Sequence, residues 1–321
     1  MKWIGIDIAK RKFDVALIEG DTVRNKVFDN TSAGHQALVD WLMARGYLPA
    51  ETWACMEATS QYYEGVAEFL WSSGFRVSVV NPLQIKAFGE SRLSRQKTDR
   101  ADAALIARFG EQQSPVPWQP ASPEIRELQR LVARLEAVQQ MRVQEQTRRH
   151  EARGEALESI DRVLALLSEE QAKLEQRIHD HIDQHPHLRQ QRDLLTSIPG
   201  VGERVSSYFL AWLQMDRFDD VRQAVAFIGL SPRHRQSGES VRGKSRLSKV
   251  GHARLRKILY LPAMSAMRHN PAAQTFADRL KASGKRGKVV LGAIMRKLVH
   301  WMFGVLKSGQ PFDAKMAIAR C

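Results

Sequence analysis

Apolar and polar residues alternate over the first thirty positions of the chain. Ile4, Ile6 and Ile8 are separated by small or polar residues, and residues 13–17 repeat the same period of two. A period of two is typical of a β-strand with one buried face. A more polar segment over 22–28 predicts a third strand, so the chain is expected to begin with three strands joined by short turns.

Helical and strand patterns then alternate as far as residue 80. Periodic apolar positions predict helices over 32–46 and 62–74, and apolar runs predict strands over 51–59 and 75–80. Three strands in hairpin order, followed by alternating helix and strand, predict an α/β domain with a mixed sheet and helices on its faces. This order matches the ribonuclease H-like fold.

A long helical tract follows over residues 121–188. Apolar residues of its second half recur at heptad-like spacing, and Gly154 is the expected bend. The tract predicts a helical hairpin or a coiled-coil spacer, and a coiled coil would imply self-association. The alternative is an ordinary amphipathic helix pair packed on its own domain.

Residues 189–321 predict a mostly α-helical third domain, after the α/β domain over 1–120 and the spacer. Two helical patterns meet at Pro199-Gly200-Val201-Gly202, which is typical of a helix-hairpin-helix. Gly200 and Gly202 would let backbone N–H groups approach a phosphate. A tight turn that merely needs glycine is the alternative.

A basic segment rich in serine and glycine is expected to form a loop over 233–252, and helical patterns resume at Ala253. Residues 221–321 hold 21 Lys/Arg and three Asp/Glu, whereas the other 220 residues hold 28 and 32. The net charge of +14 therefore belongs to the C-terminal third and predicts a polyanionic partner, nucleic acid before a membrane. The residues expected to bind nucleic-acid backbones here are Arg233, Arg235, Arg242, Lys244, Arg246 and Lys249.

Other classes of protein are excluded by composition. Cys55 and Cys321 are the only cysteines, too few for a disulfide framework or a cysteine zinc site. No signal-peptide pattern opens the chain, and no apolar stretch is expected to approach the roughly 20 residues of a membrane helix. We therefore expect a cytoplasmic protein with no membrane partner.

The histidines between 179 and 187 lack the spacing and the cysteines of a zinc site, so a polar helix end is expected there.

Four acids are candidates for a magnesium site. Asp7 lies in the first strand, Glu57 closes an apolar strand, and Asp99 and Asp102 share one face of a predicted helix. Each alone is more simply a hydrogen-bonded core acid or a helix-end acid. A ribonuclease H-like sheet would gather all four at one edge, and such oxygen ligands suit Mg²⁺ in phosphodiester chemistry. Lys10 and Lys97 nearby are candidates for phosphate contacts, with solvated surface lysines as the alternative.

Serines of the basic segment are candidates for a nucleophile. A serine hydroxyl needs activation, and nearby cations and a metal would supply it while holding a phosphate. Composition and spacing leave the choice open among Ser237, Ser240, Ser245 and Ser248. The alternative for each is a loop serine that touches phosphate.

Eight short motifs follow one another along the chain: Gly5-Ile6-Asp7 with Lys10, Met56-Glu57-Ala58-Thr59, Asn81-Pro82, Lys97-Thr98-Asp99-Arg100-Ala101-Asp102-Ala103, Ile198-Pro199-Gly200-Val201-Gly202, Gly229-Leu230-Ser231-Pro232, Gln236-Ser237-Gly238 and Lys249-Val250-Gly251-His252. Their order resembles that in the DEDD transposases of the insertion-sequence one-hundred-and-ten family, relatives of the pilin-gene invertases. Each motif is weak alone, and together they cover nearly the whole chain.

The resemblance implies a RuvC-like N-terminal domain, a coiled-coil spacer and a C-terminal transposase domain. It implies Asp7, Glu57, Asp99 and Asp102 as metal ligands and Ser237 as the nucleophile. It further implies donor and target DNA, a structured noncoding guide (bridge) RNA, and a homo-oligomer, dimer or tetramer, with active sites shared between subunits. Two alternatives remain: a metal-dependent, structure-selective nuclease of the Holliday-junction resolvase type, and a nucleic-acid-binding protein without chemistry.

Overall fold

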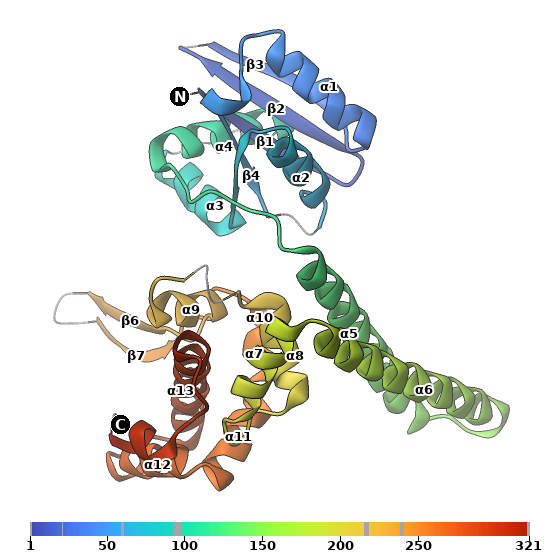
Figure 1. The fold of residues 1–321 in the computed structure, drawn as a ribbon, viewed down its shortest axis with the longest axis vertical. Coiled ribbons are helices and arrows are strands. Elements are labelled where there is room, and N and C mark those ends of the chain that lie inside the picture. The colour runs from blue at the N-terminus through green and yellow to red at the C-terminus, as the bar shows by residue number, and fades with distance from the viewer. Residues whose placement is uncertain are drawn as a thin grey trace. The chain divides into compact units, whose positions relative to one another are not determined.

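The computed structural model describes residues 2–20, 22–58, 61–92, 98–214, 218–237 and 241–319, with the backbone alone for 234–237 and 241–245. The chain divides into two compact units, Met1–Ala121 and Ser122–Cys321 (Figure 1). The predicted helical tract falls in the same unit as the C-terminal helices. The division into three domains stays a prediction.

The first unit is built on a five-stranded mixed sheet. Its strands are β1 (Lys2–Ile8), β2 (Lys12–Glu19), β3 (Thr22–Asp29), β4 (Thr52–Glu57) and β5 (Arg76–Val80). They lie in the order β3-β2-β1-β4-β5, with antiparallel β1–β2 and β2–β3 pairs and parallel β1–β4 and β4–β5 pairs. The predicted mixed sheet is confirmed, and its order is consistent with a ribonuclease H-like, RuvC-like domain.

Helices cover both faces of this sheet (Figure 1). The helices of the unit are α1 (Ser32–Met43), α2 (Glu64–Ser72), α3 (Pro82–Ser91) and α4 (Asp99–Gln113), with a short 3-10 helix at Pro49–Glu51. Successive side chains of a strand point to opposite faces. Ile4 and Ile6 of β1 therefore enter a core with α1 and α2, whereas Trp3 enters a second core with α3 and α4.

Helix α4 lies very close to β1 because residue 5 is glycine. A Cβ atom at Gly5 would stand 2.0 Å from the carbonyl oxygen of Ala103 and 2.3 Å from the backbone nitrogen of Ala107. At Gly110, further along α4, a Cβ atom would stand 2.4 Å from the ring of Trp3. The helix therefore runs antiparallel to β1, and its first turn reaches the carboxyl end of that strand.

The second unit is mostly helical. Its elements are α5 (Pro123–Arg149), α6 (Gly154–Gln184), α7 (Pro186–Thr196), α8 (Glu203–Trp212), α9 (Val221–Ile228), β6 (Pro232–Ser237), β7 (Val241–Leu247), α10 (Ala253–Ile258), α11 (Tyr260–His269), α12 (Pro271–Ala282), α13 (Gly287–Ser308) and α14 (Ala314–Ala319).

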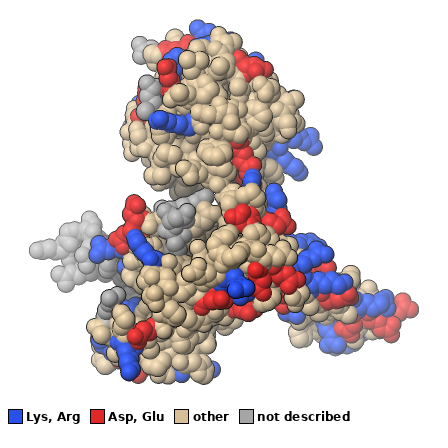
Figure 2. Space-filling view, in the orientation of Figure 1, with Lys and Arg blue, Asp and Glu red and all other residues tan. Residues whose placement is uncertain are grey.

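Helices α5 and α6 pack along each other as a helical hairpin, and Gly154 takes a left-handed conformation (φ 57°) at the turn. Figure 2 shows basic and acidic side chains interspersed along this hairpin. Leu174 and Ile178 of α6 are buried, whereas Val143 of α5 and Leu166 of α6 are 58% and 65% exposed. The hairpin is one of the two predicted forms, and a coiled-coil seam stays a prediction.

The basic segment expected to be a loop is an antiparallel β-ribbon, so that expectation was wrong. β6 pairs with β7 from Pro232–Leu247 to Ser237–Val241, with an irregularity between Arg233 and Arg235. The ribbon escaped detection because its sequence shows no alternation of apolar and polar residues.

Helix α13 shows that the expectation of no apolar stretch as long as a membrane helix was wrong. In the described part of the chain it is the one helix long and apolar enough to cross a membrane, with 22 residues and a mean hydropathy of 1.5. In the fold, 61% of that apolar stretch is buried. The helix packs against α7, α9, α11 and α12, which is the position of a core helix.

Candidate functional site

Two of the four candidate acids stand at the ends of neighbouring parallel strands. The β1–β4 ladder runs as far as the Ile6–Met56 pair, and Asp7 and Glu57 are the next residue on each strand. Asp7 shares the α4 face of β1 with Gly5, and Glu57 shares that face of β4 with Cys55. Both acids are half-buried. The carboxyl ends of parallel strands thus bring two carboxylates from distant sequence positions together.

The first turn of α4 supplies the other two acids. Thr98 caps this helix, and its hydroxyl oxygen accepts a hydrogen bond from the Ala101 amide at 3.2 Å. The helix therefore begins at Asp99 and places Asp99 and Asp102 in its first turn. Asp102 is half-buried and Asp99 is exposed. Because α4 is antiparallel to β1, both lie beside the β1 end that carries Asp7.

Burial and mutual repulsion raise the pKa values of the strand acids. Burial, together with the charges of Asp102, Asp99 and Asp14, raises the pKa of Asp7 to about 6. Burial likewise raises the pKa of Glu57 to about 7, with contributions from Asp7 and Asp102. Carboxyl groups that disfavour one another's ionised forms share one electrostatic environment, so the four candidates form a single acidic cluster.

Two members of this cluster were missed by the sequence analysis. Asp14 pairs directly with Asp7 in the β1–β2 register and is only 4% exposed. The Lys12 ammonium group donates a hydrogen bond to Asp99 Oδ2 at 3.0 Å and stands 3.7 Å from Asp14 Oδ2. Lys12 therefore neutralises part of the cluster. The pairing of Asp14 with Asp7 could have been inferred from the sequence, because a tight turn after Ile8 brings residues 7 and 14 opposite each other.

The donor set of the cluster fits a divalent cation, although the side chains do not form a ready-made cage. All four candidate ligands are carboxylates, the oxygen donors that Mg²⁺ and Mn²⁺ prefer. The raised pKa values of Asp7 and Glu57 mark carboxylates that a cation would stabilise. Among the described residues, no three His, Cys, Asp or Glu side chains are grouped closely enough to hold a metal ion. One of the four carboxylates, Asp99, is paired with the Lys12 ammonium group at 3.0 Å.

The candidate residues of the C-terminal third lie on and around the β-ribbon. Ser237 is the last residue of β6, opposite Val241. Arg233 and Arg246 face each other across the ribbon and are exposed, as is Lys249 after it. Ser248 is engaged locally, because its hydroxyl oxygen accepts a hydrogen bond from the Val250 amide at 3.3 Å. Lys97 and Ser240 lie outside the described residues, as do the side chains of Arg235, Ser237, Arg242, Lys244 and Ser245.

The remaining candidate positions have structural partners or open surroundings. Lys10 is exposed on the β1–β2 turn. Gly200 has φ 102°, and a Cβ atom there would stand 2.9 Å from the Ala266 backbone nitrogen of α11. Gly200 is thus required for packing against α11, which favours the tight-turn alternative at this position. Gly202 is exposed at the start of α8 with open space around it, so a phosphate contact there stays a prediction.

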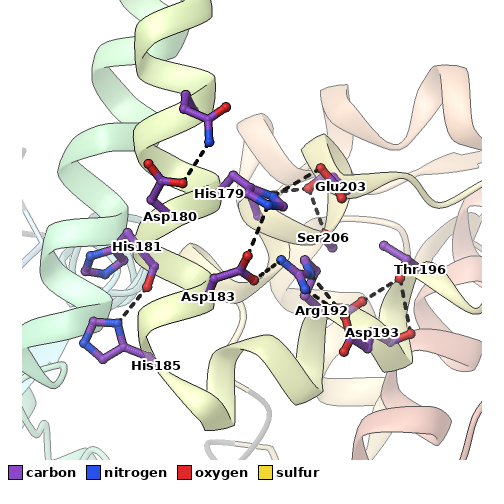
Figure 3. A network of polar contacts seen from close by, with 12 residues as sticks. His179, Asp180, His181, Asp183, His185, Arg192, Asp193, Thr196, Glu203 and Ser206 are labelled. Atoms are coloured by element: carbon purple, nitrogen blue, oxygen red, sulfur yellow. Dashed lines mark hydrogen bonds and ion pairs between the residues drawn. The ribbon is translucent and has the colours of Figure 1, made fainter.

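The histidine segment forms a polar network that ties α6 to α7 and α8 (Figure 3). His179 of α6 stands 3.1 Å from Asp183 and 3.6 Å from Glu203 at the start of α8. Asp183 also pairs with Arg192 of α7. The other three histidines have partners too: His181 contacts the backbone carbonyl oxygen of Glu124 in α5, His187 contacts the Glu124 carboxylate, and His185 contacts the carbonyl oxygen of His181.

Comparison with known proteins identifies the family. A DEDD transposase model of the IS110 type, described as a transposase, matches residues 4–152, and a model described as the transposase IS116/IS110/IS902 family matches residues 192–278. Pilin gene-inverting proteins of Moraxella bovis and Moraxella lacunata are each 33% identical to the chain over 98% of its length and 98% of theirs. The chain belongs to the IS110 family of transposases.

The two family models cover both groups of candidate residues. A protein of insertion element IS110 from Streptomyces coelicolor is 28% identical over 49% of this chain and 38% of that relative. The first family match contains the four acids of the transposase, and the second contains Ser237. The transposase is therefore a DNA-recombining enzyme, and the resemblance read from its motifs is confirmed.

Proposed function

We propose that this transposase moves an insertion sequence by RNA-guided DNA recombination, with a divalent metal, Mg²⁺, at the acidic cluster and a covalent serine–DNA intermediate at Ser237. The observation that supports it most is the gathering of Asp7, Glu57, Asp99 and Asp102 from β1, β4 and α4, with pKa values raised at the two strand acids. Recombination of DNA agrees with a cytoplasmic location.

The acids have a defined task in this scheme. Asp7 and Glu57 would hold the cation from the strand ends, and Asp99 and Asp102 would complete its oxygen ligands from α4. A bound Mg²⁺ would stabilise the negative charge that develops on the phosphate and on the leaving oxygen. Lys12 holds Asp99 at 3.0 Å, so it positions this acid and offers a positive charge to an incoming phosphate.

Ser237 would make the covalent bond. Its hydroxyl oxygen attacks the scissile phosphorus, one P–O bond to the serine forms, and one P–O bond of the DNA backbone breaks. The serine loses its proton, and the leaving DNA oxygen gains one to become a hydroxyl group. Reversal of the same step, with a hydroxyl group from another strand, joins the exchanged ends. The covalent link conserves the energy of the phosphodiester bond, so rejoining needs no nucleotide cofactor.

The charge distribution supports nucleic-acid binding by the second unit. The excess of 21 Lys/Arg over three Asp/Glu in residues 221–321 suits phosphate backbones. A guide RNA that pairs with donor and target DNA would read the sequence, so that the protein needs to bind only shape and phosphate. Arg233 and Arg246 on the exposed ribbon are suited to such contacts.

Self-association is part of this proposal. The outer part of the α5–α6 hairpin leaves Val143, Val163 and Leu166 exposed, and exposed apolar side chains at helical spacing suit a second copy of the chain. A dimer or tetramer would allow the acids of one subunit to act with Ser237 of another.

One experiment tests the core of the proposal. The RNA that copurifies with the transposase is sequenced, and recombination between two plasmids with matching target and donor sites is then measured with that RNA and Mg²⁺. We expect Ser237→Ala and Asp102→Ala to abolish recombination, and Ser240→Ala, in the same segment, to retain it. We also expect a protein–DNA adduct in denaturing gels for the parent chain and for Ser240→Ala, and none for Ser237→Ala.

The alternatives predict different outcomes. Cleavage and joining by Ser237→Ala would refute the serine intermediate and favour a metal-dependent nuclease that uses the acids and water. The absence of any specific RNA would refute guidance. Recombination that is indifferent to Asp102→Ala would remove the metal role from the cluster.

A further inference from the structure

The last residues of β1 and β4 are not paired with each other, although the two strands are neighbours in the sheet. The parallel ladder stops at the Ile6–Met56 pair, one residue before Asp7 and Glu57. Beyond that pair, Asp7 is paired with Asp14 of β2 and Glu57 with Val80 of β5, so each acid is held by its outer neighbour. Burial is the main cause of the raised pKa values of both acids, and the charge of Asp7 contributes to the raised pKa of Glu57. Repulsion between the two acids favours separation of the strand ends, and a link between the ends would oppose it.

The side chain of Asn30 makes this link. Asn30 stands between β3 and α1, and its Nδ2 group donates hydrogen bonds to the carbonyl oxygens of Ala9 at 3.3 Å and Tyr62 at 3.0 Å. Ala9 lies two residues after Asp7, and Tyr62 lies five residues after Glu57. One carboxamide therefore connects Ala9, shortly after one acid, with Tyr62, shortly after the other.

Asn30 is itself held on both sides. Its backbone N–H donates to the Arg11 carbonyl oxygen at 2.8 Å, on the β1–β2 turn. Its Oδ1 atom lies 2.9 Å from Nε2 of His35, one turn into α1. Since Oδ1 can only accept, Nε2 of His35 carries the proton, and the imidazole fixes which way the Asn30 amide points.

His35 occupies a closely packed site. It is 7% exposed, and its ring centre lies 5.8 Å from those of both Phe13 and Phe69. A Cβ atom at Gly65 of α2 would stand 3.1 Å from Cε1 of the imidazole, so a larger residue there would press on the ring. Burial lowers the pKa of His35, which keeps the ring neutral at physiological pH with one donor nitrogen.

We propose that Asn30, oriented by His35, is a positioning residue that sets the separation of the Asp7 and Glu57 strand ends and thereby the affinity of the acidic cluster for a divalent cation. The inference rests on the proposed role of these acids as cation ligands. Asn30 touches neither substrate nor cation in this scheme. It acts through the two carbonyl groups that it holds.

The test measures cation binding by the full-length chain as the rise in its melting temperature with increasing Mg²⁺ or Mn²⁺ concentration. Loss of a residue that orients metal ligands typically weakens metal binding 10- to 100-fold. We expect Asn30→Ala to need about tenfold more cation for the half-maximal rise. Asn25→Ala is the matched control, because Asn25 is an exposed asparagine of the neighbouring β3 strand, and it should behave as the parent chain.

A second variant covers the case in which Asn30→Ala does not fold. His35→Phe fills the space between Phe13 and Phe69 but cannot donate to Asn30 Oδ1, so we expect a smaller loss of cation affinity in the same direction. The cation dependence of plasmid recombination should shift with the binding curve for both variants, with maximal rates recovered at high cation concentration.

The outcomes separate this inference from the proposed function. If the parent chain is stabilised by the cation and Asp7→Asn abolishes that effect, the acidic site stands. Parent-like cation affinity in folded Asn30→Ala, or in His35→Phe where Asn30→Ala does not fold, would then overturn the positioning role alone. If the parent chain is not stabilised, or Asp7→Asn is stabilised equally, the metal site fails and the positioning role fails with it.

Discussion

Replacement of Asp7 by asparagine should stabilise the cation-free fold at neutral pH while abolishing recombination. The pKa of Asp7 is raised from 3.8 to about 6 in the folded chain, first by burial and then by the neighbouring acids. The folded state thus binds a proton more tightly than the unfolded state does. The carboxyl group therefore contributes stability that is complete below about pH 4 and is lost as the pH rises through about 6. Asparagine has nearly the same shape but no group that ionises, so it avoids this loss of stability.

The size of the effect follows from the pKa. A rise of about 2 pKa units corresponds to about 3 kcal/mol at 1.36 kcal/mol per unit. Asp7 is only half-buried, and solvent screening reduces the figure to about 1–1.5 kcal/mol. We expect Asp7→Asn to raise the free energy of unfolding of the first unit by about 1 kcal/mol at about pH 8 and to change it little at about pH 4. The corresponding rise in melting temperature is about 4 °C for a unit of this size.

The assay is thermal or urea unfolding followed by circular dichroism, in buffer with a chelator, at several pH values between about 4 and 8. Asp40→Asn is the control, because Asp40 is an exposed acid of α1, on the opposite face of the sheet. The reasoning is refuted if Asp7→Asn brings no gain at the higher pH, or the same gain at both ends of the range. Saturating Mg²⁺ should reverse the order, since a ligand stabilises only the state that binds it.

Three further predictions address the support of the site and the nucleic-acid surface. Gly5→Ala should destabilise the first unit by about 3 kcal/mol in urea unfolding, because its Cβ atom would stand 2.0 Å from the Ala103 carbonyl oxygen and force α4 away from β1; an unchanged midpoint would contradict this close approach. Thr98→Ala should cost about 1 kcal/mol through loss of the α4 cap, and Thr98→Ser should restore it. Arg246→Ala should lower the slope of log affinity against log salt for DNA binding by about 1, without regard to sequence, and an unchanged slope would exclude a phosphate contact.

Much of the acidic cluster could be inferred from sequence because each member occupies a definite place in a recognisable strand or helix pattern. Asp7 lies within an apolar strand, Glu57 closes another, and Asp99 and Asp102 open a helix three residues apart. Residue type and element order then place all four at one edge of the sheet. Ser237 is different, since nothing in the local pattern separates it from its serine neighbours. Its assignment depends on the family motif, and it stays a proposal.

The missing parts depend on contacts that no local pattern encodes. Lys12 and Asp14 join the cluster through the register of the β1–β2 hairpin. Asn30 acts through backbone carbonyl groups, which carry no signature in the sequence. The β-ribbon is built from arginine, serine and glycine, so propensity and alternation both point to a loop. Helix α3 was not predicted, because Pro82 can stop a strand and can also begin a helix that Asn81 caps.

The position of the acidic cluster follows from the absence of a side chain at residue 5. With any larger residue there, α4 would move outward, and its first turn would carry Asp99 and Asp102 away from the end of β1. The same close approach contributes to the burial, and to the nearby negative charges of α4, that raise the pKa values of Asp7 and Glu57. Tight helix packing thus creates the electrostatic strain that a bound cation would relieve, and the Asn30 link keeps the strand ends from relieving it by separation. Stability and cation binding should therefore respond in opposite directions to neutral substitutions among these acids.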